Sequence, residues 1–272
     1  MNCLNRWPGA VLLLVCCLTV PLAECAEQAT FDQDFREMMA PTRLRLTGGE
    51  QPTKFCKASP DGLRCTIPAG DGQVSTCGIE ARFVVRGNFE IVAGYKLTEV
   101  ARPDQGQGAG VKISIKDTQG EWASLQRIHL KKDGQIFSAH RAVKQPDDKY
   151  RHSSETQPAK SDHGRLKLVR DGDLLTYSVA DGDATEFTEI RAETFTNGDL
   201  AQLYLASQTG GAKTGIDVVW TELHVRADEI HQPGVAVAKK QSQRWWPYVV
   251  MAVGAALLVL VAVMFVWRRR AG

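Results

Sequence analysis

The stretch that decides the fold is Asn88-Phe89-Glu90-Ile91-Val92-Ala93-Gly94-Tyr95-Lys96-Leu97. Its large apolar residues fall on every second position: Phe89, Ile91, Ala93, Tyr95 and Leu97. Glu90 and Lys96 occupy positions between them. Because successive side chains of a β-strand point to opposite faces, this alternation predicts a strand with one buried face and one face toward solvent.

Outward from this stretch, the same period of two recurs in short segments. They are residues 110–116, 122–131, 135–140, 165–170, 174–178, 200–207 and 217–226. Turns rich in Gly, Asp, Asn and Pro separate them, so we expect an all-β protein, an antiparallel β-sandwich of the jelly-roll type. Two segments depart from the pattern. Residues 31–39 are predicted to form a short helix, and the polar residues 140–163 a long surface loop.

The composition is that of a globular protein. The 272 residues are 43% hydrophobic and 24% charged, and the formal net charge is +2. These values argue against a disordered or fibrous chain and for one main domain. The basic residues are scattered and not interleaved with aromatic residues, so we expect no nucleic-acid partner.

Residues 1–25 have the layout of a secretory signal peptide. Arg6 precedes an apolar run over 10–20, and Pro21 and small residues follow it. Cleavage is expected after Cys25 or Ala26. Residues 22–25 also resemble a lipobox, in which Cys25 would be lipidated, although Glu24 stands where that motif has a small residue. An uncleaved anchor is less favoured, because the apolar run is short for a membrane span.

Residues 246–267 are predicted to form a transmembrane helix. Twenty-two residues at about 1.5 Å each reach about 33 Å, which is enough to cross a bilayer core. Three arginines, 268–270, follow at once. With the signal peptide, this predicts a single-pass type I protein of the cell membrane. The expected order is an N-terminal segment (26–41), an extracytoplasmic sandwich (42–230), a linker (231–245), a helix in contact with membrane lipid (246–267) and a cytoplasmic tail (268–272).

Three cysteines lie within the expected sandwich, namely Cys56, Cys65 and Cys77. Pro60-Asp61-Gly62 is a turn signal, and a turn centred on Pro60 and Asp61 places Cys56 and Cys65 opposite each other. An exported domain permits disulfides, so we favour a Cys56–Cys65 bond with Cys77 free and buried. Other pairings stay open, as does the alternative that all three are buried thiols. The spacing does not indicate a zinc site, and no metal is expected.

Several motifs occur together in a familiar order. They are Asp61-Gly62-Leu63-Arg64, Gly87-Asn88-Phe89-Glu90-Ile91 followed by Tyr95, Gly108-Ala109-Gly110-Val111, the segment 164–172, and Asp217-Val218 leading to Val225-Arg226-Ala227-Asp228. Over residues 42–228 the chain resembles a family of uncharacterised exported domains abundant in planctomycete bacteria, which is similar to concanavalin A-like lectin/glucanase sandwiches. The resemblance implies that fold. It implies no catalytic residues, because the family has none assigned.

The carboxylates do not form the pair that glycoside cleavage needs. Retaining glycosidases hold two carboxyl groups about 5–5.5 Å apart. The nearest match in the sequence, residues 181–186, carries a glycine where a turn is expected, and we interpret it as a solvated turn. Asp217 and Glu222 would point to opposite faces of a regular strand. No catalytic residue is therefore proposed.

A ligand site is predicted on the last strand. Sugar sites combine aromatic faces with polar groups that fix orientation. By strict alternation Trp220, His224 and Arg226 share one face, and Trp122 is a weaker candidate elsewhere. The alternative for Trp220 is packing between or over the sheets. No cofactor is expected, because Asp71 and Asp104 could ligate calcium but no Asp-x-Asp-x-Asp array supports it.

These observations favour a membrane-anchored, non-catalytic module outside the cell that recognises a glycan or a protein of the cell envelope. Two alternatives remain, a glycoside hydrolase-like enzyme and a purely structural envelope protein.

Overall fold

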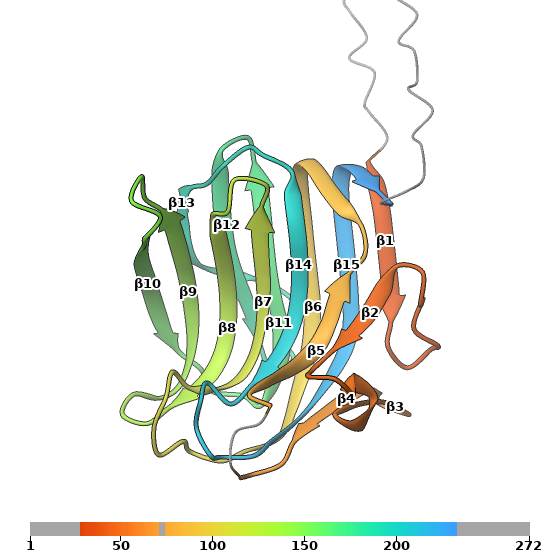
Figure 1. Ribbon diagram of the computed structural model, residues 1–272, viewed down its shortest axis with the longest axis vertical. Coiled ribbons are helices and arrows are strands. Elements are labelled where there is room, and N and C mark those ends of the chain that lie inside the picture. Colours follow the sequence, from red (N-terminus) through yellow and green to blue (C-terminus); the bar gives the residue numbers. More distant parts are fainter. Residues whose placement is uncertain (1–27, 71–73, 233–272) are drawn as a thin grey trace, which may run out of the picture. The chain divides into compact units, whose positions relative to one another are not determined.

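The computed structural model describes residues 28–70 and 74–232 (Figure 1). This part of the chain is all-β and holds one 3-10 helix and no α-helix. The elements are β1 (Ala29–Asp34), β2 (Leu44–Thr47), η1 (Pro52–Lys54), β3 (Cys56–Ser59), β4 (Gly62–Ile67), β5 (Thr76–Ala81), β6 (Val84–Val100), β7 (Ala109–Asp117), β8 (Trp122–Leu130), β9 (Gly134–Lys144), β10 (Tyr150–Pro158), β11 (His163–Asp171), β12 (Leu174–Asp181), β13 (Thr188–Thr194), β14 (Leu200–Gln208) and β15 (Ile216–His231).

The strands form two layers. The front sheet, nearer the viewer in Figure 1, has the order β10-β9-β8-β7-β14-β5-β2. The back sheet has the order β13-β12-β11-β6-β15. Beyond it, β15 also pairs with β1 and with β4, and β4 pairs with β3. A single pairing, Leu200 of β14 with Val85 of β6, joins the two layers. Neighbouring strands such as β1 and β15, β11 and β6, and β7 and β14 are antiparallel, as the alternating segments predicted.

The core lies between the inner faces of the two sheets. The deciding stretch falls within β6, and its five alternating residues are all buried there, with Ile91 and Ala93 fully so. On the front sheet, the inner residues Ile113 of β7 and Leu125 of β8 are also fully buried. Because alternate residues of a strand face opposite sides, this burial sets which side chains each sheet presents outward.

The alternation of β15 shifts by one residue along the strand. Val218 and Trp220 are fully buried, but so are Val225 and Ala227, which lie on the other parity. An irregular step of this kind is what a β-bulge produces. The prediction that Trp220, His224 and Arg226 share one face is therefore wrong. An extra residue between Trp220 and Leu223 reverses the alternation, so Trp220 points into the core while His224 and Arg226 point outward.

Two other expectations are also wrong. Residues 31–39 were expected as a helix, but the chain forms β1 there and then turns. Residues 140–163 were expected as a loop, but β9 runs to Lys144 and β10 covers Tyr150–Pro158. β1 buries the alternate residues Phe31 and Gln33, but the polar Gln33 hides the apolar alternation in the sequence. β10 lies at a sheet edge and is exposed along almost its whole length. A strand that buries little carries no apolar alternation for the sequence to reveal.

The predicted signal peptide (1–25), transmembrane helix (246–267) and cytoplasmic tail (268–272) lie outside the described residues. Within 28–70 and 74–232, no helix is long and apolar enough to cross a bilayer. The described strands belong to one compact unit, Met1–Ile230, and a second unit, His231–Gly272, begins where β15 ends.

Trp220 offers a test of the core. Its indole Nε1–H donates to Ser207 Oγ of β14 across the sandwich at 3.1 Å, and both residues are fully buried. Trp220→Phe keeps the ring but leaves the Ser207 hydroxyl without its donor, which should cost about 1–3 kcal/mol of unfolding free energy. Trp220→Ala should cost about 3–5 kcal/mol. Urea unfolding of the full chain measures both. Equal stability of Trp220→Phe and wild type would contradict the role of this hydrogen bond.

Candidate functional site

The structure separates the four residues that the sequence proposed for ligand binding. Trp220 lies in the core and has no exposed surface for a ligand. His224 and Arg226 lie on the outer face of the back sheet. Trp122 opens β8 of the front sheet and is partly exposed. The two sheets therefore offer two separate outer faces.

On the outer face of the back sheet, basic groups are matched by acids. His224 Nδ1 lies 2.7 Å from Asp32 Oδ1, and its Nε2 lies 3.3 Å from Glu222 Oε2. Burial lowers the pKa of His224, but the hydrogen bonds to Asp32 and Glu222 outweigh it and raise the pKa above its usual value. Arg226 lies 3.8 Å from Glu90. These contacts engage the polar groups of this face with one another.

The outer face of the front sheet, which we call the front face, is built in rows across the strands. The strand register aligns one row as His140, Ser124, Ser114, Tyr204, Glu80 and Arg45 on β9, β8, β7, β14, β5 and β2. The next row is Ser138, Gln126, Lys112, Ala206, Gly78 and Thr47 on the same six strands. Side chains in the middle of these rows are small or polar. The largest of them are Tyr204 and Lys112.

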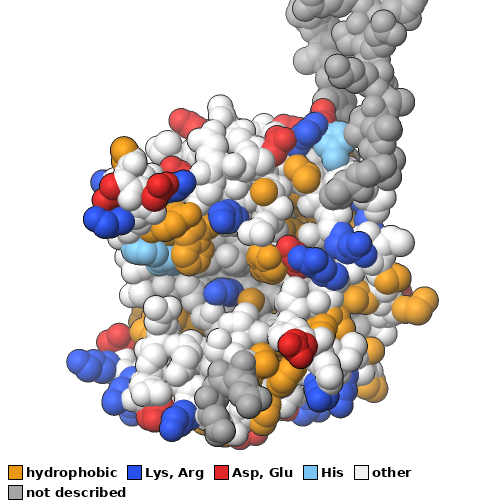
Figure 2. Space-filling model, viewed as in Figure 1, with side chains coloured by type: hydrophobic (Ala, Val, Ile, Leu, Met, Phe, Trp, Pro, Cys, Tyr) orange, Lys and Arg blue, Asp and Glu red, His pale blue; other side chains and the backbone are white. Residues whose placement is uncertain are grey.

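One end of the front face is aromatic. The Trp122 ring lies 5.2 Å from the His140 ring and 6.2 Å from the His152 ring, measured between centroids. The two imidazoles stack at 5.2 Å, and His140 Nε2 lies 3.1 Å from His152 Nδ1. Tyr150 completes this aromatic end, at 6.4 Å from His152. Figure 2 looks onto the front face, where pale blue histidines and orange apolar groups gather on the left.

The other end of the front face carries an ion pair. Arg45 of β2 binds Glu80 of β5, whose side chain is 9% exposed. Burial and a hydrogen bond with Glu80 raise the pKa of the Tyr204 phenol beside them. Glu80 is the one acidic side chain in the two rows, and its charge is already matched by Arg45.

Between the ends lie two amides and a lysine. Gln208 Nε2 donates to Gln126 Oε1 at 3.1 Å, and Gln126 Nε2 donates to Ser124 Oγ at 3.1 Å. Lys112, directly across from Gln126 in the register, is half-buried. Amide and hydroxyl groups of this kind can fix the orientation of a sugar through its hydroxyl groups.

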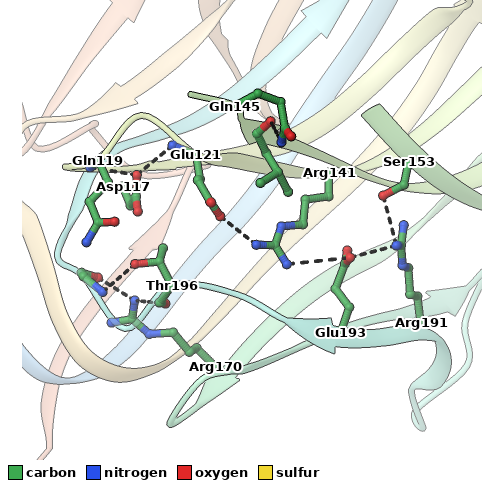
Figure 3. Close-up of polar contacts among 12 residues, drawn as sticks. Asp117, Gln119, Glu121, Arg141, Gln145, Ser153, Arg170, Arg191, Glu193 and Thr196 are labelled. Atoms are coloured by element: carbon green, nitrogen blue, oxygen red, sulfur yellow. Dashed lines mark hydrogen bonds and ion pairs between the residues drawn. The ribbon is translucent and has the colours of Figure 1, made fainter. Parts of the chain in front are cut away.

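Carboxylates near the open edge of the sandwich are held in ion pairs. Figure 3 shows Arg141 of β9 between Glu121 and Glu193, with nitrogen-to-oxygen distances of 2.6 and 3.8 Å. Arg191 of β13 lies 2.7 Å from the same Glu193 oxygen and donates to Ser153 at 3.0 Å. Because these groups bridge the front and back sheets, we assign them a structural role.

The interpretation of residues 181–186 as a turn agrees with the structure. Asp181 ends β12, and its carboxylate accepts from the backbone N–H groups of Lys160 and Ser161 at 2.8 and 3.0 Å. Asp183 lies 3.2 Å from His163, and Asp162 lies 2.9 Å from it. The hydrogen bonds with Asp162 and Asp183 raise the pKa of His163. Asp162, His163 and Asp183 line an open pocket of about 790 Å³ beside the back sheet, where charges of both signs alternate.

The three cysteines form one buried cluster. Cys56 and Cys65 are directly opposite in the β3–β4 hairpin, as the turn signal predicted, and their sulfur atoms lie 3.0 Å apart. Cys77 comes from β5 of the front sheet, and all three sulfurs lie within 4.8 Å of one another as thiols. Hydrogen bonds from Cys65 and Cys77 lower the pKa of Cys56. Three converging sulfurs could hold a soft metal ion, an arrangement that the sequence spacing did not indicate.

The comparisons with known proteins identify the family. A family model described as "Protein of unknown function (DUF1583) C domain" matches residues 21–244. The chain belongs to this family. No curated protein matches it.

Solved structures share its fold at low sequence identity. A Crh5 transglycosylase is 15% identical, with a TM-score of 0.53, and the alignment covers 74% of this chain and 85% of that one. A legume lectin-like domain from Entamoeba histolytica is 13% identical, with a TM-score of 0.50 and coverage of 72% and 96%. Rv0315 of Mycobacterium tuberculosis, described as a pseudo beta-1,3-glucanase, is 9% identical, with a TM-score of 0.52 and coverage of 72% and 98%. The fold is thus similar to lectin and glucanase sandwiches.

The cysteine cluster leads to a prediction about oxidation. Directly opposite residues of antiparallel strands have Cα atoms about 4.5–5.5 Å apart, within the range of a disulfide. We expect oxidised full chain to contain a Cys56–Cys65 bond and a free Cys77 thiol. Alkylation without reduction, followed by peptide mass spectrometry, measures this, and Cys77→Ser should keep the bond. A linked peptide containing Cys77, or three alkylated thiols, would contradict the pairing.

Proposed function

We propose that the chain is a non-catalytic glycan-binding module with a concanavalin A-like jelly-roll domain, and that the glycan lies across the front face. The solved structures of similar fold include a Crh5 transglycosylase in complex with NAG, at a TM-score of 0.54. They also include LamA of Zobellia galactanivorans in complex with laminaritriose and laminaritetraose, at a TM-score of 0.51. Those proteins hold sugars on this type of sandwich, which supports the assignment of a glycan ligand.

The aromatic end of the front face is the observation that carries this proposal. Sugar rings pack their C–H faces on aromatic rings, and Trp122 is a partly exposed indole held in place by two histidines. The serines and amides of the adjacent rows supply hydrogen-bond donors and acceptors along six strands. An extended sugar chain fits this combination of one aromatic platform and a broad polar floor.

An enzyme is the second candidate, and the fold similarity to a transglycosylase favours it. The ion pairs formed by the nearby carboxylates argue against an enzyme. Glu80 is paired with Arg45, and Glu121 and Glu193 share Arg141. Glycoside hydrolysis requires one carboxyl group that can donate a proton and a second that can act as nucleophile or base. Carboxylates that already contact an arginine of the chain are not free to contact a substrate, so we favour binding without cleavage.

Trp122→Ala tests the ligand face. Removing the indole should lower glycan affinity at least about tenfold, which corresponds to about 1.4 kcal/mol, while Trp122→Phe should retain part of it. A glycan array of the full chain, followed by calorimetry with the best ligand, measures the change. Incubation of the same ligand with the chain, followed by chromatography of the products, should show no cleavage.

The outer face of the back sheet supplies the matched control. A double variant, His224→Ala with Arg226→Ala, changes two partly exposed residues of the other sheet and should bind the ligand as wild type does. Loss of binding in this variant, with Trp122→Ala unaffected, would move the ligand to the back sheet. Binding to no glycan would leave the structural envelope role, and release of shorter sugars would establish the enzyme.

We further propose that the module is anchored in the cell membrane with the sandwich outside. The apolar run of 10–20 and the apolar segment 246–267 with its following arginines support this topology. Protease added to intact cells should remove the sandwich domain and leave a small membrane-bound fragment, as detected with an antibody against residues 268–272. Full protection of the sandwich until the cells are lysed would contradict this orientation.

A further inference from the structure

A lysine stands near the middle of the front face. Lys112 lies on β7 between Val111 and Ile113, which are both fully buried, so its side chain points outward. Its neighbours across the strands are Gln126 on β8 and Ala206 on β14. The residue is half-buried, and burial lowers the pKa of its ammonium group. Water therefore solvates this charge poorly.

Nothing in the described part of the chain neutralises Lys112. Among the described residues, no ion pair or hydrogen bond involves the Lys112 ammonium group. Burial is the cause of the shift in the pKa of Lys112. The one acidic residue of the two rows is Glu80 on β5. It forms an ion pair with Arg45 on β2, the strand on the far side of β5 from β14. A partly buried charge without a counter-charge is unfavourable, and it is retained where a ligand supplies the opposite charge.

His140, two strands from Lys112 on the same face, is also partly buried. Burial lowers the pKa of His140, and the charges of His152, Lys112 and Arg191 lower it further. These groups come from β10, β7 and β13, and Trp122 of β8 covers the ring from a fourth strand. In the register, Gln126, Ser124 and Ser138 lie between Lys112 and His140, so no carboxylate of the two rows separates them.

The back sheet provides the contrast within the same domain. There Lys167 lies 3.9 Å from Glu90, Arg226 lies 3.8 Å from Glu90, and Arg64 is bound to Asp217. These three basic side chains thus have acidic neighbours supplied by the chain itself. On the front face, by contrast, Lys112 has no acidic neighbour within the described part of the chain. It lies beside the amides that would hold a sugar.

We propose that the front face takes an anionic glycan, with a carboxylate or sulfate group of the sugar seated on Lys112 beside His140. This inference rests on the proposed glycan-binding function and specifies its ligand class. The sugar ring that carries the charge lies over Gln126, which is directly across from Lys112, and the glycan extends from there along β8 toward the Trp122 indole. A neutral glycan would leave the ammonium without a partner.

A nucleic acid is the competing polyanion, and the face favours it less. Binding to a phosphate backbone uses several spaced lysines and arginines, with aromatic rings on which bases stack. The front face presents Lys112 and, directly across from Trp122, Lys116, while Arg45 is already paired with Glu80. Two such lysines on a polar floor match a glycan with occasional acidic groups better than a continuous phosphate backbone.

The test uses oligosaccharide pairs that differ only in charge. One pair is an oligogalacturonate and its methyl ester; the other is a sulfated galactan fragment and its desulfated form. The full chain should bind the charged member of at least one pair about tenfold or more tightly than the neutral member, as measured by calorimetry. Lys112→Gln should bring this ratio close to one, and Lys112→Arg should preserve it. The pair that shows the ratio distinguishes carboxylate from sulfate.

Lys167→Gln is the matched control, because Lys167 is a partly buried strand lysine of the other sheet with an acidic partner. It should leave the ratio unchanged, and thermal unfolding of each variant checks that it folds. Equal affinity for charged and neutral members would overturn this inference while the proposed glycan function stands. Binding to neither member would overturn both. Equally tight binding of a single-stranded DNA of similar charge would overturn the assignment of a glycan.

Discussion

The mutual burial of two sheet faces is the constraint on which the rest of the molecule depends. Side chains such as Ile113 of the front sheet and Leu168 of the back sheet are removed entirely from water, and Trp220 ties the layers with a hydrogen bond to Ser207. At about 25 cal/mol per Å² of apolar surface, this burial is the main favourable term of the fold. Because the inner residues carry the stability, the outer residues of the front sheet are free to be small and polar.

Two buried arginines close the ends of this core without acidic partners of their own. Arg170 donates to the carbonyl oxygens of Thr196 and Gly198 at 3.2 and 2.6 Å (Figure 3). Its guanidinium lies over the Phe89 ring. Arg127 donates to Ser161 O at 2.7 Å and lies over Phe137. Burial lowers the pKa of both side chains. Each guanidinium satisfies several backbone carbonyls where strands end, which organises the loops around the sandwich.

The comparisons and the charges of the front face address different questions. Similarity to lectin and glucanase sandwiches at 9–15% identity establishes a fold, and such a fold hosts many functions. The ligand has to be argued from the site. The net charge of +2 gave no reason to expect an anionic partner. It is a sum over the whole chain, and it does not record that acids accompany the basic groups of the back sheet but not Lys112.

The sequence by itself determined the all-β fold, the buried alternation of Phe89 to Leu97 and the opposition of Cys56 and Cys65, because period-two patterns and turn residues act locally. It could not locate β10, since an exposed edge strand carries no apolar period. It misjudged the face of Trp220, since one extra residue in β15 reverses the parity. Only the tertiary structure brought His140, His152, Lys112 and Trp122 together, and Cys77 to the other two cysteines, because these meetings depend on strand order and register across separate segments of the chain.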